Sequence, residues 1–179
     1  MRLWHKDLIP YLPKQQLIAQ WRECCAICSN IANKGTPNHL LVNKVKEFHA
    51  FHFWNYCSLI GEEFNKRGYK LSKKSFNNFV HNFFEGFKND LHGMCISTDT
   101  FIPFEELFFN WHNERYLKQC LFNLQEKYDC GGISEKEWKI IENKFGQYLK
   151  LNAELKKEDK ELREYKRMNQ PLYVNPMSL

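Results

Sequence analysis

The sequence lacks any hydrophobic run long enough to cross a membrane. No window of its 179 residues approaches the roughly 18 uncharged apolar residues that a membrane-spanning helix needs. The opening segment, Met1 to Asp7, also lacks the apolar core of a secretory signal peptide. These absences predict a cytoplasmic protein that does not bind membranes.

Several catalytic motifs are also missing. The sequence contains no phosphate-binding glycine loop, no His-Glu-x-x-His metal motif and no Gly-x-Ser-x-Gly nucleophile motif. Their absence argues against the nucleotide hydrolases, metalloproteases and serine hydrolases that use them.

Glycine and proline are scarce, with 8 and 6 residues, and they fall between long stretches that have helical spacing. Because 43% of the residues are hydrophobic and 16% are aromatic, the chain can bury a sizeable core. The expected fold is all-α, a single compact domain of about five helices. It spans residues 1–169, and an extended tail follows over residues 170–179.

The helix boundaries follow from apolar spacing and local end signals. Helices are predicted from Lys14 to Asn33, from Leu40 to Arg67, from Ser72 to Lys88, from Pro103 to the Gly131-Gly132 pair, and from a Ser134/Glu137 capping box onward. In the third of these, six apolar residues form one face that should lie in the core: Phe76, Phe79, Val80, Phe83, Phe84 and Phe87. The last helix becomes mostly charged after Lys156.

Seven cysteines without a secretion signal indicate reduced thiols rather than a disulfide framework. Three of them, Cys24, Cys25 and Cys28, together with His49 and His52, have spacings that a metal site could use. The alternative is that the thiols serve as small apolar groups on a helix and the histidines lie beside the core or line a groove.

The positive charge is concentrated in the first half of the chain. Residues 1–90 hold 13 Lys and Arg against 7 Asp and Glu, a net charge of +6, whereas residues 91–179 have a net charge of −1. The run that contains Lys66, Arg67, Tyr69 and Lys70 could bind phosphates or could be a solvated loop. This distribution indicates an anionic ligand such as nucleic acid.

The first predicted helix has two faces when its residues are placed at about 100° intervals. Its apolar side is centred on Leu17, Trp21, Cys25 and Cys28, and Gln16, Gln20, Glu23 and Asn30 fall on the opposite side. Arg22 lies between the two faces. The wheel leaves open whether Arg22 and Glu23 form a functional pair or an ordinary solvated one.

Three segments carry a resemblance to a known family. The run from Gln15 to Glu23 resembles the first helix of the pyrimidine-dimer DNA glycosylases of the phage endonuclease V type, and Lys66-Arg67-Gly68-Tyr69 resembles a later helix end in that family. The opening Met1-Arg2-Leu3-Trp4-His5 and the stretch Trp21-Arg22-Glu23-Cys24-Cys25 are similar to its bacterial branch. The resemblance covers about residues 1 to 70.

This resemblance implies an all-α DNA repair enzyme that needs no metal or other cofactor. Its nucleophile is the N-terminal α-amine. Because the bulky Arg2 follows Met1, we expect Met1 to be retained and to supply this amine. Glu23 matches the essential carboxylate, Arg22 matches a residue that holds DNA phosphates, and Arg2 matches a basic residue beside the nucleophile. Lys66, Arg67 and Lys70 are predicted to contact DNA as well.

The predicted function is therefore that of a monomeric DNA glycosylase with apurinic/apyrimidinic (AP) lyase activity on damaged double-stranded DNA. Its substrate is a pyrimidine dimer or a related damaged base. The family's basic residue after the glutamate is Ala26 here, its histidine on this helix is Gln16, and its aromatic tail is not recognisable. These departures keep a second hypothesis open, a helical nucleic-acid-binding or protein-interaction module without catalysis.

Overall fold

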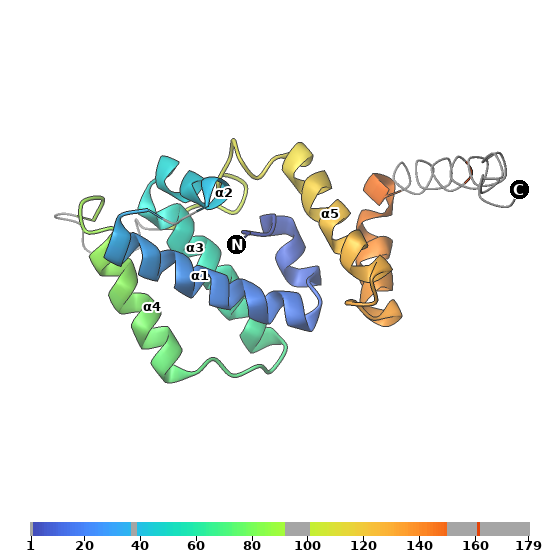
Figure 1. Ribbon diagram of the computed structural model, residues 1–179, viewed down its shortest axis with the longest axis horizontal. Coiled ribbons are helices and arrows are strands. Elements are labelled where there is room, and N and C mark those ends of the chain that lie inside the picture. The colour runs from blue at the N-terminus through green and yellow to red at the C-terminus, as the bar shows by residue number, and fades with distance from the viewer. Residues whose placement is uncertain (1, 37–38, 92–100, 150–160, 162–179) are drawn as a thin grey trace, which may run out of the picture.

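Helices form all the regular secondary structure in the computed structural model, which describes residues 2–36, 39–91, 101–149 and 161. The elements are a 3-10 helix η1 (Lys6–Tyr11), α1 (Lys14–Lys34), α2 (Leu40–Asn43), a 3-10 helix η2 (Lys44–Glu47), α3 (Ala50–Lys66), α4 (Lys73–Gly86), α5 (Glu114–Asp129) and a last helix over residues 135–149 (Figure 1). The expected all-α fold is confirmed. Within these ranges no helix is both long and apolar enough to span a bilayer.

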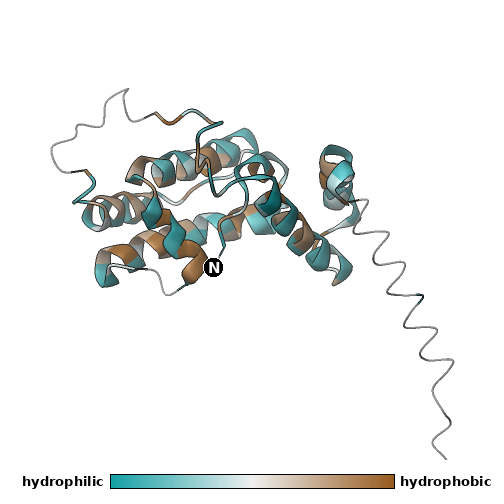
Figure 2. Ribbon diagram, turned by 90° about the horizontal axis from the view of Figure 1, so that it is seen from above, coloured by the Kyte–Doolittle hydropathy of each residue, from teal (hydrophilic) through white to brown (hydrophobic). Residues whose placement is uncertain are grey.

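Helix α1 packs against both α3 and α4. The ring of Trp21 on α1 lies 5.1 Å from that of Phe79 on α4, and its indole nitrogen donates a 3.1 Å hydrogen bond to Ser75. The helices are amphipathic, and apolar and polar residues alternate along their ribbons in Figure 2. Burial of these apolar faces stabilises the packing of the three helices.

Gly86 allows α4 to approach α1 closely. A Cβ atom at this position would lie 3.0 Å from the Cγ2 atom of Ile31 and 3.1 Å from the backbone nitrogen of Ala32. Because such contacts are tighter than most packed Cβ atoms make, a larger residue here would require Ile31 or the backbone of α1 to shift by a few tenths of an ångström.

Local end signals are confirmed where they depend on neighbouring residues. Helix α1 ends at Gly35, which has a φ of 74°, in the left-handed region that glycine adopts readily. The Ser72 hydroxyl accepts a hydrogen bond from the Ser75 amide at the start of α4. The amides of Ser134 and Glu137 each donate to the other's side chain, which is the predicted capping box.

The prediction of one continuous helix from Leu40 to Arg67 is wrong. The segment is divided into α2, η2 and α3, and His49 caps the start of α3 by accepting from the Phe51 amide. The Phe48 ring packs against Phe108, with their centroids 5.2 Å apart. The break therefore orients an aromatic side chain toward a distant part of the chain, which local spacing cannot reveal.

The prediction that a helix opens at Pro103 is also wrong, because residues 104–111 form turns and α5 begins only at Glu114, capped by Asn113. Phe108 has a positive φ of 54° and is fully buried. Its backbone amide donates a 3.1 Å hydrogen bond to Nδ1 of His52. Burial of this ring offsets a backbone conformation that L-residues rarely adopt.

The apolar face predicted for α4 is only partly in the core. Phe79, Phe83 and Phe87 are buried, but Phe76 and Phe84 are 45% and 36% exposed. The expected face was wider than the surface that α1 and α3 cover. The predicted charged continuation after Lys156 and the tail over residues 170–179 lie outside the described residues.

Candidate DNA-binding and catalytic site

The start of the chain is held against α1 by two side chains of that helix. The backbone amide of Arg2 donates to Oε2 of Glu23, and the amide of Trp4 donates a 3.0 Å hydrogen bond to Oε1 of Gln20. Residues three apart on a helix lie on one face, so these two acceptors can bind alternate amides of the segment that crosses them. The Glu23 carboxylate is thereby fixed beside the beginning of the chain.

Tyrosines from two other helices hold the carbonyl groups of the same segment. Tyr116 on α5 donates a 2.5 Å hydrogen bond to the Leu3 carbonyl, and Tyr56 on α3 donates a 2.8 Å hydrogen bond to the Trp4 carbonyl. Burial raises the pKa of both tyrosines, so their hydroxyls remain protonated donors. In Figure 1 this dark blue segment runs between α1 and α5.

Two stacked histidines complete the anchoring. The backbone amide of Lys6 donates a 3.0 Å hydrogen bond to Nδ1 of His112, and the rings of His5 and His112 stack with centroids 5.1 Å apart. Burial lowers the pKa of His112 well below its usual value and also lowers the pKa of His5. The neutral form of His112 can accept from Lys6, so the anchoring depends on that form.

A cavity of about 630 Å³ lies beside this anchored segment. Among the described residues it is lined by Arg2, Trp4, Gln15, Gln16, Ala19, Gln20, Arg22, Glu23, His39, Asn123 and Lys127. Three of these side chains are cationic and one, Glu23, is anionic. A carboxylate flanked by cations in an open cavity suits an anionic ligand that undergoes chemistry at one point.

The structure brings together three of the residues that the sequence predicted. Arg2, Arg22 and Glu23 line the same cavity, with Arg22 exposed and Glu23 half-buried. The predicted nucleophile, Met1, lies outside the described residues. It directly precedes Arg2, whose amide is bound to Glu23.

The basic run at the end of α3 lies apart from this cavity. The Arg67 guanidinium forms a 2.6 Å ion pair with Glu63 and donates to the carbonyls of Leu12 and Pro10 at 2.6 and 2.8 Å. These contacts join the end of α3 to the end of η1. Lys66 and Lys70 are exposed and do not line the cavity that contains Glu23.

The cysteines and histidines that could have formed a metal site have other roles. Cys24 and Cys28 are buried in the core, and burial raises the pKa of Cys28. His49 caps α3, and His52 accepts from the Phe108 amide. Within the residues that the structure describes, no group of three His, Cys, Asp or Glu side chains is arranged to hold a metal ion.

The structure adds cavity residues that the sequence did not indicate. Gln20, expected on the polar face of its helix, is only 1% exposed because the chain start covers it. Asn123 and Lys127 come from α5, about a hundred residues after Glu23. No local pattern marks them, since only tertiary packing brings α5 to the chain start.

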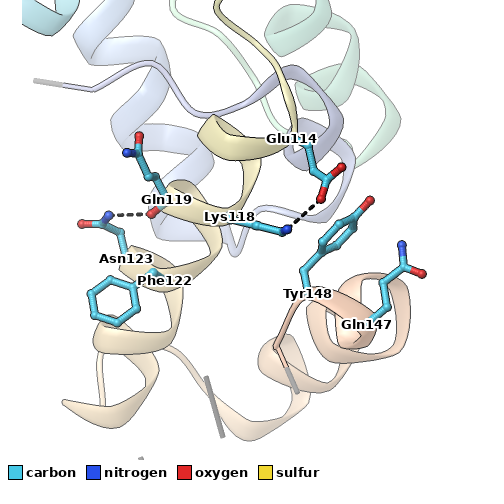
Figure 3. Close-up of a pocket in the computed structure, with 7 residues that line it drawn as sticks. All are labelled: Glu114, Lys118, Gln119, Phe122, Asn123, Gln147 and Tyr148. Atoms are coloured by element: carbon cyan, nitrogen blue, oxygen red, sulfur yellow. Dashed lines mark hydrogen bonds and ion pairs between the residues drawn. The ribbon is translucent and has the colours of Figure 1, made fainter. Parts of the chain in front are cut away.

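A second cavity, of about 530 Å³, lies between α5 and the last helix. Figure 3 shows the residues that line it: Glu114, Lys118, Gln119, Phe122, Asn123, Gln147 and Tyr148. Lys118 forms a 2.7 Å ion pair with Glu114 here. Asn123 lines both cavities, so the two adjoin along α5.

One comparison with known proteins finds a match, which covers part of the chain. No curated protein and no solved structure matches the chain. Residues 1–77 match the family model of the pyrimidine dimer DNA glycosylases. This segment includes the chain start, Arg22 and Glu23 but not α5. The resemblance to the pyrimidine-dimer DNA glycosylase family is thus confirmed over residues 1–77.

Proposed function

We propose that this protein is a DNA glycosylase with AP-lyase activity that acts on pyrimidine dimers or related damaged bases in double-stranded DNA. The observation that carries the proposal is the hydrogen bond from the Arg2 amide to the Glu23 carboxylate. Because Met1 directly precedes Arg2, only the Cα and the carbonyl carbon of Met1 lie between a terminal α-amine on Met1 and that amide nitrogen. The family match over residues 1–77 supports the same assignment.

The proposed nucleophile is the α-amine of Met1. An α-amine has an ordinary pKa of roughly 7.7 to 8.0, so an appreciable fraction is neutral near pH 7.5. Its lone pair attacks the sugar C1′ atom, and the glycosidic bond breaks as the base leaves with the bonding electrons. Loss of a proton from nitrogen and opening of the sugar ring then give a protonated imine.

Glu23 has two proposed roles in these steps. Its negative charge stabilises the positive charge that develops on the sugar as the base leaves. Its carboxylate then moves protons during ring opening and during β-elimination, in which a C2′ proton is removed and the 3′ phosphate leaves. A half-buried carboxylate held by a backbone amide is well oriented for both roles.

The proposed DNA contacts come mainly from the cavity wall. Arg2 and Arg22 bind phosphates beside the damaged nucleotide, which is drawn out of the duplex because an intact helix hides C1′. Lys66 and Lys70 stay in the proposal as exposed cations outside the cavity. Arg67 contributes by holding their loop to η1.

Borohydride trapping tests the proposal. Incubation with DNA that contains an abasic site and with borohydride should reduce the imine to a permanent protein–DNA crosslink, and the crosslinked peptide should contain Met1. Acetylation of the N-terminus should abolish both trapping and strand cleavage while DNA binding persists, since only one positive charge is removed.

Peptide mapping makes the test selective. A crosslink at a lysine, for example at Lys127 in the cavity, would support the lyase activity but refute Met1 as the nucleophile. If several damaged substrates gave no crosslink although the protein bound DNA, the result would favour the non-catalytic nucleic-acid-binding module.

A further inference from the structure

Helix α5 supplies a second wall to the cavity that contains Glu23. Asn123 and Lys127 lie four residues apart on α5 and therefore on one side of the helix. Both lie beyond the segment that matches the glycosylase family. The cavity is thus built jointly by the family-like segment and by a part of the chain that lies outside the family match.

The position of this wall is fixed by packing. Helix α5 is buried through Tyr116, Leu117, Cys120, Leu121 and Leu124, and Asn123 and Lys127 border this buried face next to Tyr116. Tyr116 also donates to the Leu3 carbonyl, which joins α5 to the same chain start that Glu23 and Gln20 hold. This contact of α5 with the chain start accompanies the placement of Lys127 and Glu23 around one cavity.

Lys127 differs from the nearest comparable lysine on its helix. Within the described ranges no carboxylate forms an ion pair with Lys127, whereas Lys118 is paired with Glu114 at 2.7 Å. An unpaired cation that faces a cavity retains its charge for a ligand. A cation in the last turn of a helix also interacts favourably with the helix dipole, and this purely structural role is the alternative to be tested.

We propose that Lys127 binds a DNA backbone phosphate on the α5 side of the cavity. A nucleotide drawn into the cavity carries a phosphate on each side of its sugar. Arg2 and Arg22 provide cations at the chain start and on α1, and Lys127 provides one on α5, so the phosphates on both sides can be neutralised. This inference rests on the proposed function, since it takes DNA as the ligand.

The salt dependence of DNA binding tests the role of Lys127 separately from the catalytic reaction. The probe is a fluorescent duplex with one tetrahydrofuran abasic analogue, which cannot form an imine, and anisotropy is recorded from 50 to 200 mM salt. The variant is Lys127→Gln, the matched control is Lys118→Gln on the same helix, and Lys127→Arg restores the charge.

A single lost phosphate contact should reduce the slope of log K against log salt by about 0.9. Over this fourfold range of salt, the affinity of the wild type should then fall about 3.5 times more than that of Lys127→Gln. Lys118→Gln and Lys127→Arg should keep the wild-type slope. Thermal unfolding of each variant shows separately whether the helix dipole accounts for any change.

The outcomes distinguish this inference from the proposed function. If the wild type binds with a steep slope and Lys127→Gln has the same slope, Lys127 makes no phosphate contact although DNA remains the ligand. Equal reductions in Lys127→Gln and Lys118→Gln would indicate a diffuse field and would also overturn the inference. If binding by the wild type does not depend on salt, the proposed function itself fails.

Discussion

Replacement of Glu23 by glutamine should separate catalysis from stability. Glutamine has the same size and keeps a side-chain oxygen that can accept from the Arg2 amide. A hydrogen bond to a charged acceptor contributes about 1.5–3 kcal/mol, and a neutral one contributes about 0.5–1.5 kcal/mol. Glu23→Gln should therefore lower the free energy of unfolding by about 1 kcal/mol.

Such a loss leaves the protein folded. Native domains have about 5–15 kcal/mol of stability, and a change of about 1 kcal/mol moves the Tm of a chain of this size by roughly 2–4 °C. Catalysis should respond much more strongly, because the amide neither stabilises a cationic sugar nor moves protons. Loss of general acid–base catalysis typically costs about 10²- to 10⁴-fold in rate.

The assay combines thermal denaturation with single-turnover cleavage of abasic DNA. Glu85→Gln is the control, since it makes the same substitution on an exposed part of α4 and should change neither quantity. Cleavage by Glu23→Gln within tenfold of the wild-type rate would remove this carboxylate from the mechanism. A loss of more than about 3 kcal/mol of stability would instead assign Glu23 a structural role.

Two further predictions concern the anchoring of the chain start. Gln20→Leu leaves the buried Trp4 amide without its acceptor, so urea denaturation should show a loss of about 1–3 kcal/mol, and borohydride trapping should weaken; unchanged stability would contradict the anchoring role. Because burial lowers the pKa of His112, the imidazole binds a proton near pH 6.5 in the unfolded chain but stays neutral at that pH in the folded chain. The contribution of His112 to the free energy of unfolding should therefore be complete above about pH 6.5. As the pH falls to 5, protonation of His112 in the unfolded chain should lower this free energy by up to about 2 kcal/mol. His112→Asn should reduce this dependence, and equal stability of the wild type at pH 7.5 and 5 would refute it.

Features that depend on neighbouring residues were predictable from the sequence. The limits of α1 follow from Pro13 before its first turn and from Gly35, which adopts the left-handed conformation at its end. The Ser72 cap and the Ser134/Glu137 capping box follow from side chains that bond to the backbone within a few positions. The adjacent Arg22 and Glu23 were identified through the family resemblance, which needs only a contiguous segment.

Features that depend on distant residues were not predictable. The helix expected over residues 40–67 breaks at Phe48, whose ring packs against Phe108, and Phe108 has a positive φ within the turns that replace the helix expected after Pro103. Gln20 is buried although its helix wheel places it on the polar side, because the chain start lies across that side. In each case the deciding partner lies on another segment.

The candidate site shows the same division. The sequence by itself determined the all-α class and the ends of α1, since helical periodicity and end signals are local properties, and the family resemblance of a contiguous segment pointed to Arg22 and Glu23. Only the tertiary structure decided that the chain start reaches Glu23 and that Lys127 faces the same cavity. The physical reason is that burial of the Tyr116 side of α5 against the chain start joins segments about a hundred residues apart, and no local pattern encodes that contact.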